Sequence, residues 1–380
     1  MELRPFTMER WQSTWEHRVR FNLSESGVHP LSLRELLELA GIDGDPLGEV
    51  RLGYGQSNGS DELRERIAAL YPGATEANVL VTVGGAEANL ACFWHLMEPG
   101  EAAAVMLPNY MQVPGLIESF RARPLPFRLL EEDGWRPDLG ALERALAEGA
   151  RFVLVTNPNN PTGRVLPASD VDRIVALAER HDAWILADEV YRGAEVEGEE
   201  TPSFWGRTER VLVTHSLSKA YGLPGLRLGW VVGPEDAVAD LWSRTDYTTI
   251  SPATMSDRLA AWALEPATRS RILARTREIV RRNLQALTDW MEERTELFSY
   301  TPPEAGAICW VRYHAPVGST ELAEKLRVEK DVLVVPGDHF GVDDHLRIGF
   351  GPPEDELMEA LSRIAEAFDE ATPQDRRHEP

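Results

Sequence analysis

The chain contains 380 residues, of which 43% are hydrophobic. It is long enough to bury a large core and exceeds the length at which one core keeps growing, so we expect two domains. Lys and Arg number 39 against 62 Asp and Glu, which gives a net charge of −23. Such a field repels nucleic acid and anionic membrane surfaces, and an anionic ligand needs a small, enclosed positive pocket.

The N-terminal residues contain no apolar run of signal-peptide length, and no window approaches the ~20 apolar residues of a membrane-spanning helix. We therefore expect a cytoplasmic protein. Cys92 and Cys309 lie in apolar stretches, where buried free thiols are expected rather than a disulfide. Because the nine histidines show no paired ligand spacing, we expect no bound metal.

Between residues 76 and 232, short apolar runs alternate with helical patterns. This alternation predicts an α/β fold with a large, doubly wound and mostly parallel sheet, whose binding groups lie in the loops after the strands. The predicted strands are 79–83, 103–107, 152–156, 184–187, 211–214 and 228–232, and the predicted helices are 86–97, 110–120, 168–181 and 235–242.

After residue 251 the pattern changes to long, Arg-rich helical stretches, then to alternating strands and an amphipathic helix at 355–368. This predicts a second, smaller α+β domain. The first 45 residues are too few to fold alone and are expected to join it. We therefore divide the chain into residues 1–45, a large domain at 46–275 and a small domain at 276–380.

A glycine pair follows the first predicted strand and opens a helix. The backbone N–H groups of Gly85 and Ala86 can therefore point at a phosphate, assisted by the positive end of the helix dipole. By itself this pair is a weak signal.

A lysine, two serines and an arginine follow the strand at 211–214. A surface lysine in a polar turn is the simplest interpretation of Lys219. Alternatively, Ser216 and Arg227 hold a phosphate while the lysine amine reaches a carbonyl group. That chemistry needs a lysine with a depressed pKa, which a neighbouring cation and desolvation supply.

The spacing S-x-S-K-x7-R at residues 216–227 resembles that of the class I/II aminotransferases, which are fold-type I enzymes dependent on pyridoxal 5'-phosphate (PLP). Other motifs of the family occur in its order along nearly the whole chain. The resemblance implies that Lys219 forms a Schiff base with PLP and that Ser218 adds to the phosphate site. Many relatives carry Ser or Thr where Ala86 stands, so one side-chain hydrogen-bond donor to the phosphate is absent here. We therefore expect phosphate binding to depend more on Ser216, Ser218 and Arg227.

Two further loops match the family. The resemblance implies that Asp188 keeps the pyridine nitrogen protonated and that Tyr191 donates to the 3'-oxygen of the cofactor. In the motif N-P-x-N-P-T-G, it implies that Asn160 bonds the same oxygen and helps to place the substrate carboxylate. Helix capping and turn formation are the structural alternatives.

Three residues remain to be placed by the resemblance. It implies that Tyr110 stacks on the cofactor ring and that Tyr54 reaches the phosphate of a neighbouring subunit, so a homodimer with shared sites is expected. Core packing and a loop without a catalytic role are the alternatives. Arg347 is implied to clamp the substrate α-carboxylate, against the alternative of a structural ion pair.

The function implied is transfer of an amino group between an α-amino acid and a 2-oxo acid. Three segments, around residues 21–33, 218–230 and 332–350, also resemble the capreomycidine synthase subgroup, so β-elimination with cyclisation is the alternative. In this subgroup Gly27 and His29 would cover the substrate, although a structural histidine fits equally well. No second arginine matches a dicarboxylate-binding position.

Overall fold

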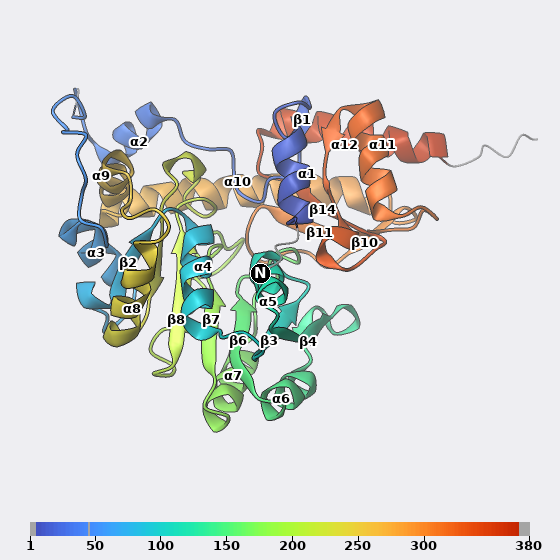
Figure 1. Cartoon of the computed structure of the whole chain (residues 1–380). Coiled ribbons are helices and arrows are strands. Elements are labelled where there is room, and N and C mark those ends of the chain that lie inside the picture. The colour runs from blue at the N-terminus through green and yellow to red at the C-terminus, as the bar shows by residue number, and fades with distance from the viewer. Residues whose placement is uncertain (1–4, 45, 372–380) are drawn as a thin grey trace, which may run out of the picture.

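The computed structural model describes residues 5–44 and 46–371, which form a large sheet domain and a smaller domain beside it (Figure 1). The large sheet has eight strands. In spatial order they are β2 (Val79–Thr82), β9 (Gly229–Val232), β8 (Val211–Ser216), β7 (Trp184–Asp188), β6 (Ala150–Thr156), β3 (Ala102–Leu107), β4 (Arg123–Leu130) and β5 (Arg136–Pro137).

The predicted mostly parallel sheet is confirmed, but β9 runs antiparallel to both β2 and β8. A parallel connection needs a crossover of a dozen or more residues, usually a helix. Between β8 and β9 lies only a loop with the short 3-10 helix η3 (Pro224–Leu226), so the chain turns back beside the strand it has just left. The sequence analysis also missed β4, whose two prolines obscure the strand pattern.

Helices cover both faces of this sheet, which explains why its central strands are buried along nearly their whole length. One core lies under α4 (Gly85–Leu96), α5 (Gln112–Ser119) and α8 (Glu235–Thr245). The other face packs against the remaining helices of this domain. These are α3 (Asp61–Ala68), α6 (Leu139–Ala147), α7 (Ala168–Arg180) and α9 (Thr254–Ala263), with the short 3-10 helices η1 (Glu76–Asn78) and η2 (Glu131–Asp133) nearby.

The smaller domain contains a four-stranded antiparallel sheet and a core of its own. Its strands, in spatial order, are β10 (Phe298–Tyr300), β11 (Ile308–Tyr313), β14 (His345–Gly349) and β13 (Val335–Pro336). Its other elements are α11 (Ser319–Lys330), η4 (Gly337–Phe340) and α12 (Glu354–Ala371). Helix α10 (Pro266–Glu292) runs unbroken through the predicted boundary at 275/276 (Figure 1), and the three-part division stays a prediction.

The N-terminal segment lies on the small domain. Helix α1 (Thr7–Trp15) packs against β13 and η4, and β1 (Phe21–Asn22) pairs in parallel with β12 (Val332–Leu333). Helix α2 (Leu33–Ala40) packs against α9 of the large domain.

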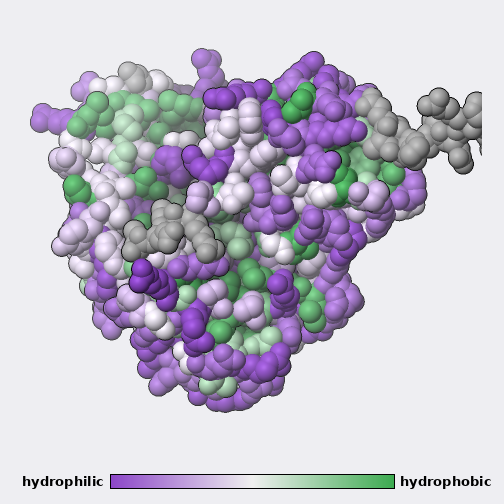
Figure 2. Space-filling model, turned by 45° about the vertical axis from the view of Figure 1, so that its right-hand side comes forward, coloured by the Kyte–Doolittle hydropathy of each residue, from purple (hydrophilic) through white to green (hydrophobic). Residues whose placement is uncertain are grey.

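Hydrophilic side chains cover most of the face seen in Figure 2, with smaller hydrophobic patches between them. Both cysteines are buried and free, as predicted. Within residues 5–44 and 46–371, no helix combines the length and apolar character that a membrane crossing demands.

Two glycines of the small domain allow the N-terminal segment to approach closely. The amide of Gly349 donates to the carbonyl of Leu23 (2.7 Å), and a side chain at Gly349 would overlap the carbonyl oxygen of Glu25. At Gly351 a side chain would overlap the carbonyl of Gly27. The contact is made by backbone atoms, which cannot rotate away.

We predict that Gly349→Ala displaces residues 23–27 and lowers the free energy of unfolding by about 1–3 kcal/mol, the usual cost of overpacking. Gly115→Ala, in the middle of α5 with nothing within 4 Å of the new methyl group, is the control. It should be neutral or slightly stabilising, because alanine favours a helix. Urea unfolding of both variants measures the difference, and equal stabilities would contradict the close approach.

Candidate active site

A pocket of about 570 Å³ opens at the carboxyl ends of the parallel strands, where the sequence analysis placed the binding loops. Its walls come from the ends of β6, β7 and β8, from the first turn of α4, from α1 and from β14. Most of the predicted site residues line it together. These are Gly85, Ala86, Tyr110, Asn160, Asp188, Tyr191, Ser216, Ser218, Lys219, Arg227 and Arg347.

Three predicted residues do not line this pocket, and their roles stay predictions. Tyr54 is 90% exposed on a loop. Gly27 packs against the backbone and side chain of Lys219, where an added Cβ would lie 3.4 Å from the Cα. The backbone N–H of His29 donates to the carbonyl of Gly351 (2.7 Å), and its ring Nδ1 lies 3.1 Å from the same oxygen.

One end of the pocket is suited to a phosphate group. Helix α4 begins at Gly85, so the amides of its first turn have no partner within the helix. The preceding residue, Gly84, has a φ of +83°, and a Cβ there would come within 2.8 Å of the guanidinium of Arg227. Ser216 ends strand β8 beside Gly85. Backbone amides, a hydroxyl group and a guanidinium therefore converge, as in other anion sites at helix N-termini.

The carboxylate of Asp188 is held in place by hydrogen bonds. It accepts from the side-chain amide of Asn89 (3.0 Å) and from the backbone amide of Val190 (3.1 Å), while the hydroxyl of Thr214 donates to Asn89 (2.8 Å). Burial raises the pKa of Asp188, and the Asn89 hydrogen bond opposes the increase. A cation beside this carboxylate, such as a protonated pyridine nitrogen, would relieve the cost of its burial.

The environment of Lys219 differs from the one expected. Its amine lies 3.5 Å from the carboxylate of Glu25. Burial lowers the pKa of Lys219, but Glu25, Tyr191 and Glu9 together outweigh burial, and the net pKa is raised. The expectation of a depressed pKa is therefore wrong, because the charged group beside the amine is a carboxylate and not a cation. Lys219 in turn lowers the pKa of Glu25.

Arg347 lies in the interior, 1% exposed, on the central strand β14. Its guanidinium donates to the side chain of Asn160 (3.0 Å) and to the carbonyl of Ser24 (2.5 Å), and its Nε has no partner. Burial lowers the pKa of Arg347. Within the described part of the chain no carboxylate lies within ion-pair distance of it, so the alternative of a structural ion pair is not supported. A buried guanidinium that lacks a carboxylate partner is suited to bind the carboxylate of a ligand.

The two tyrosines of the pocket are held from the N-terminal segment. The hydroxyl of Tyr191 donates to Ser26 (2.8 Å), and the hydroxyl of Tyr110 donates to Glu9 (2.8 Å). Phe6 packs edge-on against the ring of Tyr110, with centroids 5.1 Å apart.

Several pocket residues escaped the sequence analysis. Asn89 lies four residues after Gly85, so both residues lie on one face of α4. This spacing could have indicated from the sequence that Asn89 belongs to the pocket. Glu9 and Gln12 of α1 and its C-cap residue Glu16 follow the spacing i, i+3, i+7 and all line the pocket. Glu25 belongs to no regular element, and no pattern in the sequence points to it.

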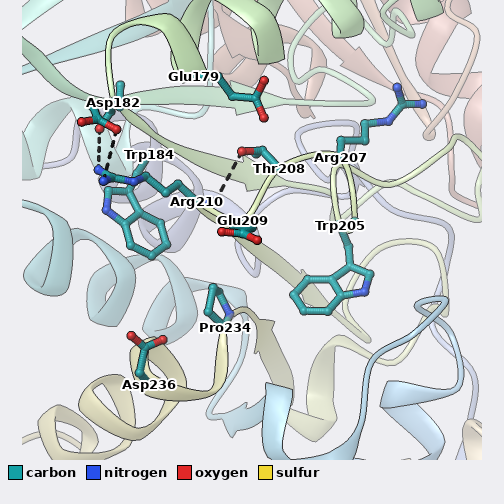
Figure 3. Close-up of a pocket in the computed structure, with 12 residues that line it drawn as sticks. Glu179, Asp182, Trp184, Trp205, Arg207, Thr208, Glu209, Arg210, Pro234 and Asp236 are labelled. Atoms are coloured by element: carbon teal, nitrogen blue, oxygen red, sulfur yellow. Dashed lines mark hydrogen bonds and ion pairs between the residues drawn. The ribbon is translucent and has the colours of Figure 1, made fainter.

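A second hollow, of about 1190 Å³, lies at the opposite edge of the sheet, where β7 and β8 begin and β9 ends (Figure 3). Both of its arginines already have partners, since Arg210 contacts the carboxylate of Asp182 (3.2 Å) and Arg207 that of Asp172 (2.7 Å). In sheets of this kind ligands bind at the carboxyl ends of the strands, so the first pocket is the candidate active site.

Comparison with known proteins defines the class. The profile of the family "Aminotransferase class I and II" matches residues 45–364. The chain belongs to this family of fold-type I PLP enzymes.

Individual relatives align with most of the length of this chain. Capreomycidine synthase of Streptomyces vinaceus is 33% identical over 94% of this chain and 92% of its own. The aspartate/prephenate aminotransferase of Thermus thermophilus is 29% identical over 86% of each chain. The crystal structure of a PLP-dependent aminotransferase from Streptococcus suis superposes with a TM-score of 0.93, at 30% identity, over 99% of this chain and 100% of that one.

PLP is therefore the cofactor, and the residues of the pocket fit it. The cradle at Gly84, Ser216 and Arg227 has donors for the phosphate group, Asp188 offers a buried carboxylate for the ring nitrogen, and Lys219 offers the amine. When bound, PLP supplies an electron sink for a negative charge developing on the substrate.

Arg227→Gln should weaken PLP binding by about 10- to 100-fold, because it removes charge-assisted hydrogen bonds worth about 1.5–3 kcal/mol. Arg207→Gln, which removes an arginine paired with Asp172 beside the distant hollow, is the matched control. PLP titration followed by protein fluorescence measures both. Equal affinities would exclude Arg227 from the phosphate site.

In the cofactor-free protein, Glu25→Gln should lower the pKa of Lys219, because the carboxylate stabilises the ammonium form. Since the folded-state pKa of Lys219 is raised, the pair stabilises the fold at neutral pH, and this contribution is lost as the pH rises through that pKa. It is also lost on acidification through the lowered pKa of Glu25. The pH dependence of Lys219 modification by an amine reagent, read by mass spectrometry, measures the shift. Glu38→Gln on the exposed side of α2 is the control, and an unchanged midpoint for Glu25→Gln would refute the pairing.

Proposed function

We propose that the protein is an aminotransferase that moves an amino group between an α-amino acid and a 2-oxo acid. The observation that carries the proposal is that the amine of Lys219 and the buried guanidinium of Arg347 line one pocket, and that Arg347 donates only to uncharged groups among the described residues. A free α-amino acid presents the matching pair of groups, a carboxylate for the guanidinium and an amine for the carbonyl chemistry at Lys219.

Each residue then has a defined task. Arg347 and Asn160 bind the α-carboxylate and orient the amino acid. Lys219 removes the proton from the α-carbon and acts as the general base. Asp188, fixed by Asn89, keeps a proton on the ring nitrogen, and Tyr191 donates to the 3'-oxygen. Helix α1 lies over the pocket through Met8 and Glu9 and limits the access of water.

We further propose that the enzyme works in the cytoplasm as a homodimer in which Tyr54 reaches the phosphate of the partner's site. Exposed side chains support an interface near this loop, since Leu52 is 83% exposed and Tyr54 90%.

Elimination of a β-substituent followed by cyclisation is the second candidate. It is favoured by the similarity to capreomycidine synthase over nearly the whole chain. In the pocket, Lys219 holds a proton after it has taken it from the α-carbon and can deliver this proton to a leaving group, while Glu25 beside it stabilises the ammonium form. Both reactions begin with removal of the α-proton and differ only in the step that follows.

Lys219→Ala should reduce turnover by at least about 100-fold, the lower range for loss of a general base, and should abolish the visible absorption of the covalently linked cofactor. Lys325→Ala, a partly exposed lysine of α11, is the control and should leave both unchanged. Normal turnover by Lys219→Ala would refute the proposal.

The two candidate reactions are separated by mixing the holoenzyme with single amino acids. Transamination predicts one equivalent of keto acid per site and accumulation of the amine form of the cofactor. Elimination predicts loss of the β-substituent with the cofactor returned to its original form. A second keto acid should restore activity only in the first case.

A further inference from the structure

The loop that follows β4 in the large domain contacts the small domain. Figure 1 shows the sheet of the small domain above β3 and β4 of the large sheet. At this junction the carboxylate of Glu131, in η2, accepts from two nitrogens of the guanidinium of Arg312 on β11, with the Nε at 3.2 Å. Such a bidentate contact is the strong form of an arginine–carboxylate pair. The pair therefore joins the two domains through side chains.

Glu131 also faces His345, which lies on β14 two residues before Arg347. The Nε2 of this buried histidine has no hydrogen-bond partner among the described residues and lies 3.5 Å from Oε1 of Glu131. Its Nδ1 lies 2.8 Å from the carboxylate of Asp344. Burial raises the pKa of Glu131, but Arg312 and His345 outweigh burial and the net pKa is lowered. One carboxylate of the large domain thus serves two groups of the small domain.

The same loop has a backbone conformation that its residue type disfavours. Trp135 has a φ of +66°, in the left-handed region, where a bulky side chain is a genuine outlier. In this conformation the indole ring of Trp135 packs edge-on against His345, with the ring centroids 6.1 Å apart. Strained residues persist where the surrounding structure holds them, and they concentrate at functional sites. The strain therefore points to a function for the contact between this loop and His345.

A row of packed rings connects His345 to the guanidinium of Arg347. Trp310 stacks on His345, with centroids 4.9 Å apart, and packs edge-on against Phe340, with centroids 5.2 Å apart. The guanidinium of Arg347 lies 5.4 Å from the centre of the Phe340 ring. Trp310 and Arg347 are also cross-strand partners on β11 and β14. Because protein interiors are closely packed, a shift of His345 should displace Arg347 as well.

The domains are also joined elsewhere by the backbone. The amides of Glu304 and Ala305 donate to the carbonyl of Gly163 (2.8 and 3.0 Å), in the loop after β6, and α10 runs from one domain into the other. Two domains joined only at such places can still turn about them, as in hinged enzymes. The contact of Glu131 lies instead on the strands that carry and flank Arg347, where it opposes such a rotation.

We propose that Glu131 is a positioning residue that holds Arg347 over the cofactor pocket. It acts through Arg312 and His345, and we call these three residues the interdomain latch. None of the three is among the described residues that line the pocket. The inference rests on the proposed function, in which Arg347 binds the substrate carboxylate. A latched domain keeps the binding-competent arrangement populated before the substrate arrives, which lowers the apparent dissociation constant.

The test compares Glu131→Gln with Glu132→Gln, the matched control, which removes an exposed charge from the same turn. The twenty standard amino acids are added singly to the holoenzyme, and the one that converts the wild-type cofactor fastest becomes the probe for all variants. We expect Glu131→Gln to raise the apparent dissociation constant of this amino acid about 3- to 10-fold. The limiting rate of conversion and the affinity for PLP should stay unchanged, because Lys219 and Asp188 are untouched.

Arg312→Gln should give a similar increase, and the double variant no more than either single variant, because both substitutions break one contact. An unchanged dissociation constant would reduce the pair to a structural ion pair and overturn the latch, even if urea unfolding showed a lower stability. A joint loss of limiting rate, PLP affinity and substrate affinity would also overturn it, because the fold as a whole would then be distorted. If no amino acid altered the wild-type spectrum, the proposed function would fail and the latch with it.

Discussion

The close approach of residues 23–29 to strand β14 is the constraint on which the pocket depends. Backbone meets backbone there, since Gly349 donates to Leu23 and the amide of His29 donates to Gly351. No side chain fits between the two segments at these glycines. The approach brings the carbonyl of Ser24 to Arg347 and the hydroxyl of Ser26 to Tyr191. A segment too short to fold alone thus supplies one wall of the site.

The distribution of charge follows from burial. The chain as a whole carries −23, so its long-range field would repel an anionic cofactor. Arg227 and Arg347 act at short range inside a pocket, where low solvent access strengthens each interaction. The negative groups of the pocket also act locally. Glu25 and Asp188 each face a position where a cation is expected. Small enclosed groups of positive and negative side chains can therefore bind charged ligands that the net charge of the protein would not attract.

The large sheet supplies the rigid part of the site. Asp188 ends β7, Thr156 ends β6 and Ser216 ends β8, so three neighbouring strands deliver polar groups at one edge. Thr214 and Asn89 then join β8 to α4 beneath Asp188. Groups mounted on strands are held more precisely than groups on loops, which suits a carboxylate that must meet a single ring nitrogen.

The sequence by itself determined the chemistry that is local. The glycine pair at 84–85, the spacing from Ser216 to Arg227 and the loop after each apolar run all depend on neighbours within a dozen residues, and the structure brings these residues to one pocket. The direction of β9 could also have been inferred, because Gly222, Pro224 and Gly225 in the stretch before it disfavour a crossover helix. Only the tertiary structure decided the partner of Lys219. Glu25 is 194 positions away in the chain and lies in no periodic element, so its contact arises from packing between distant segments, which no local pattern records.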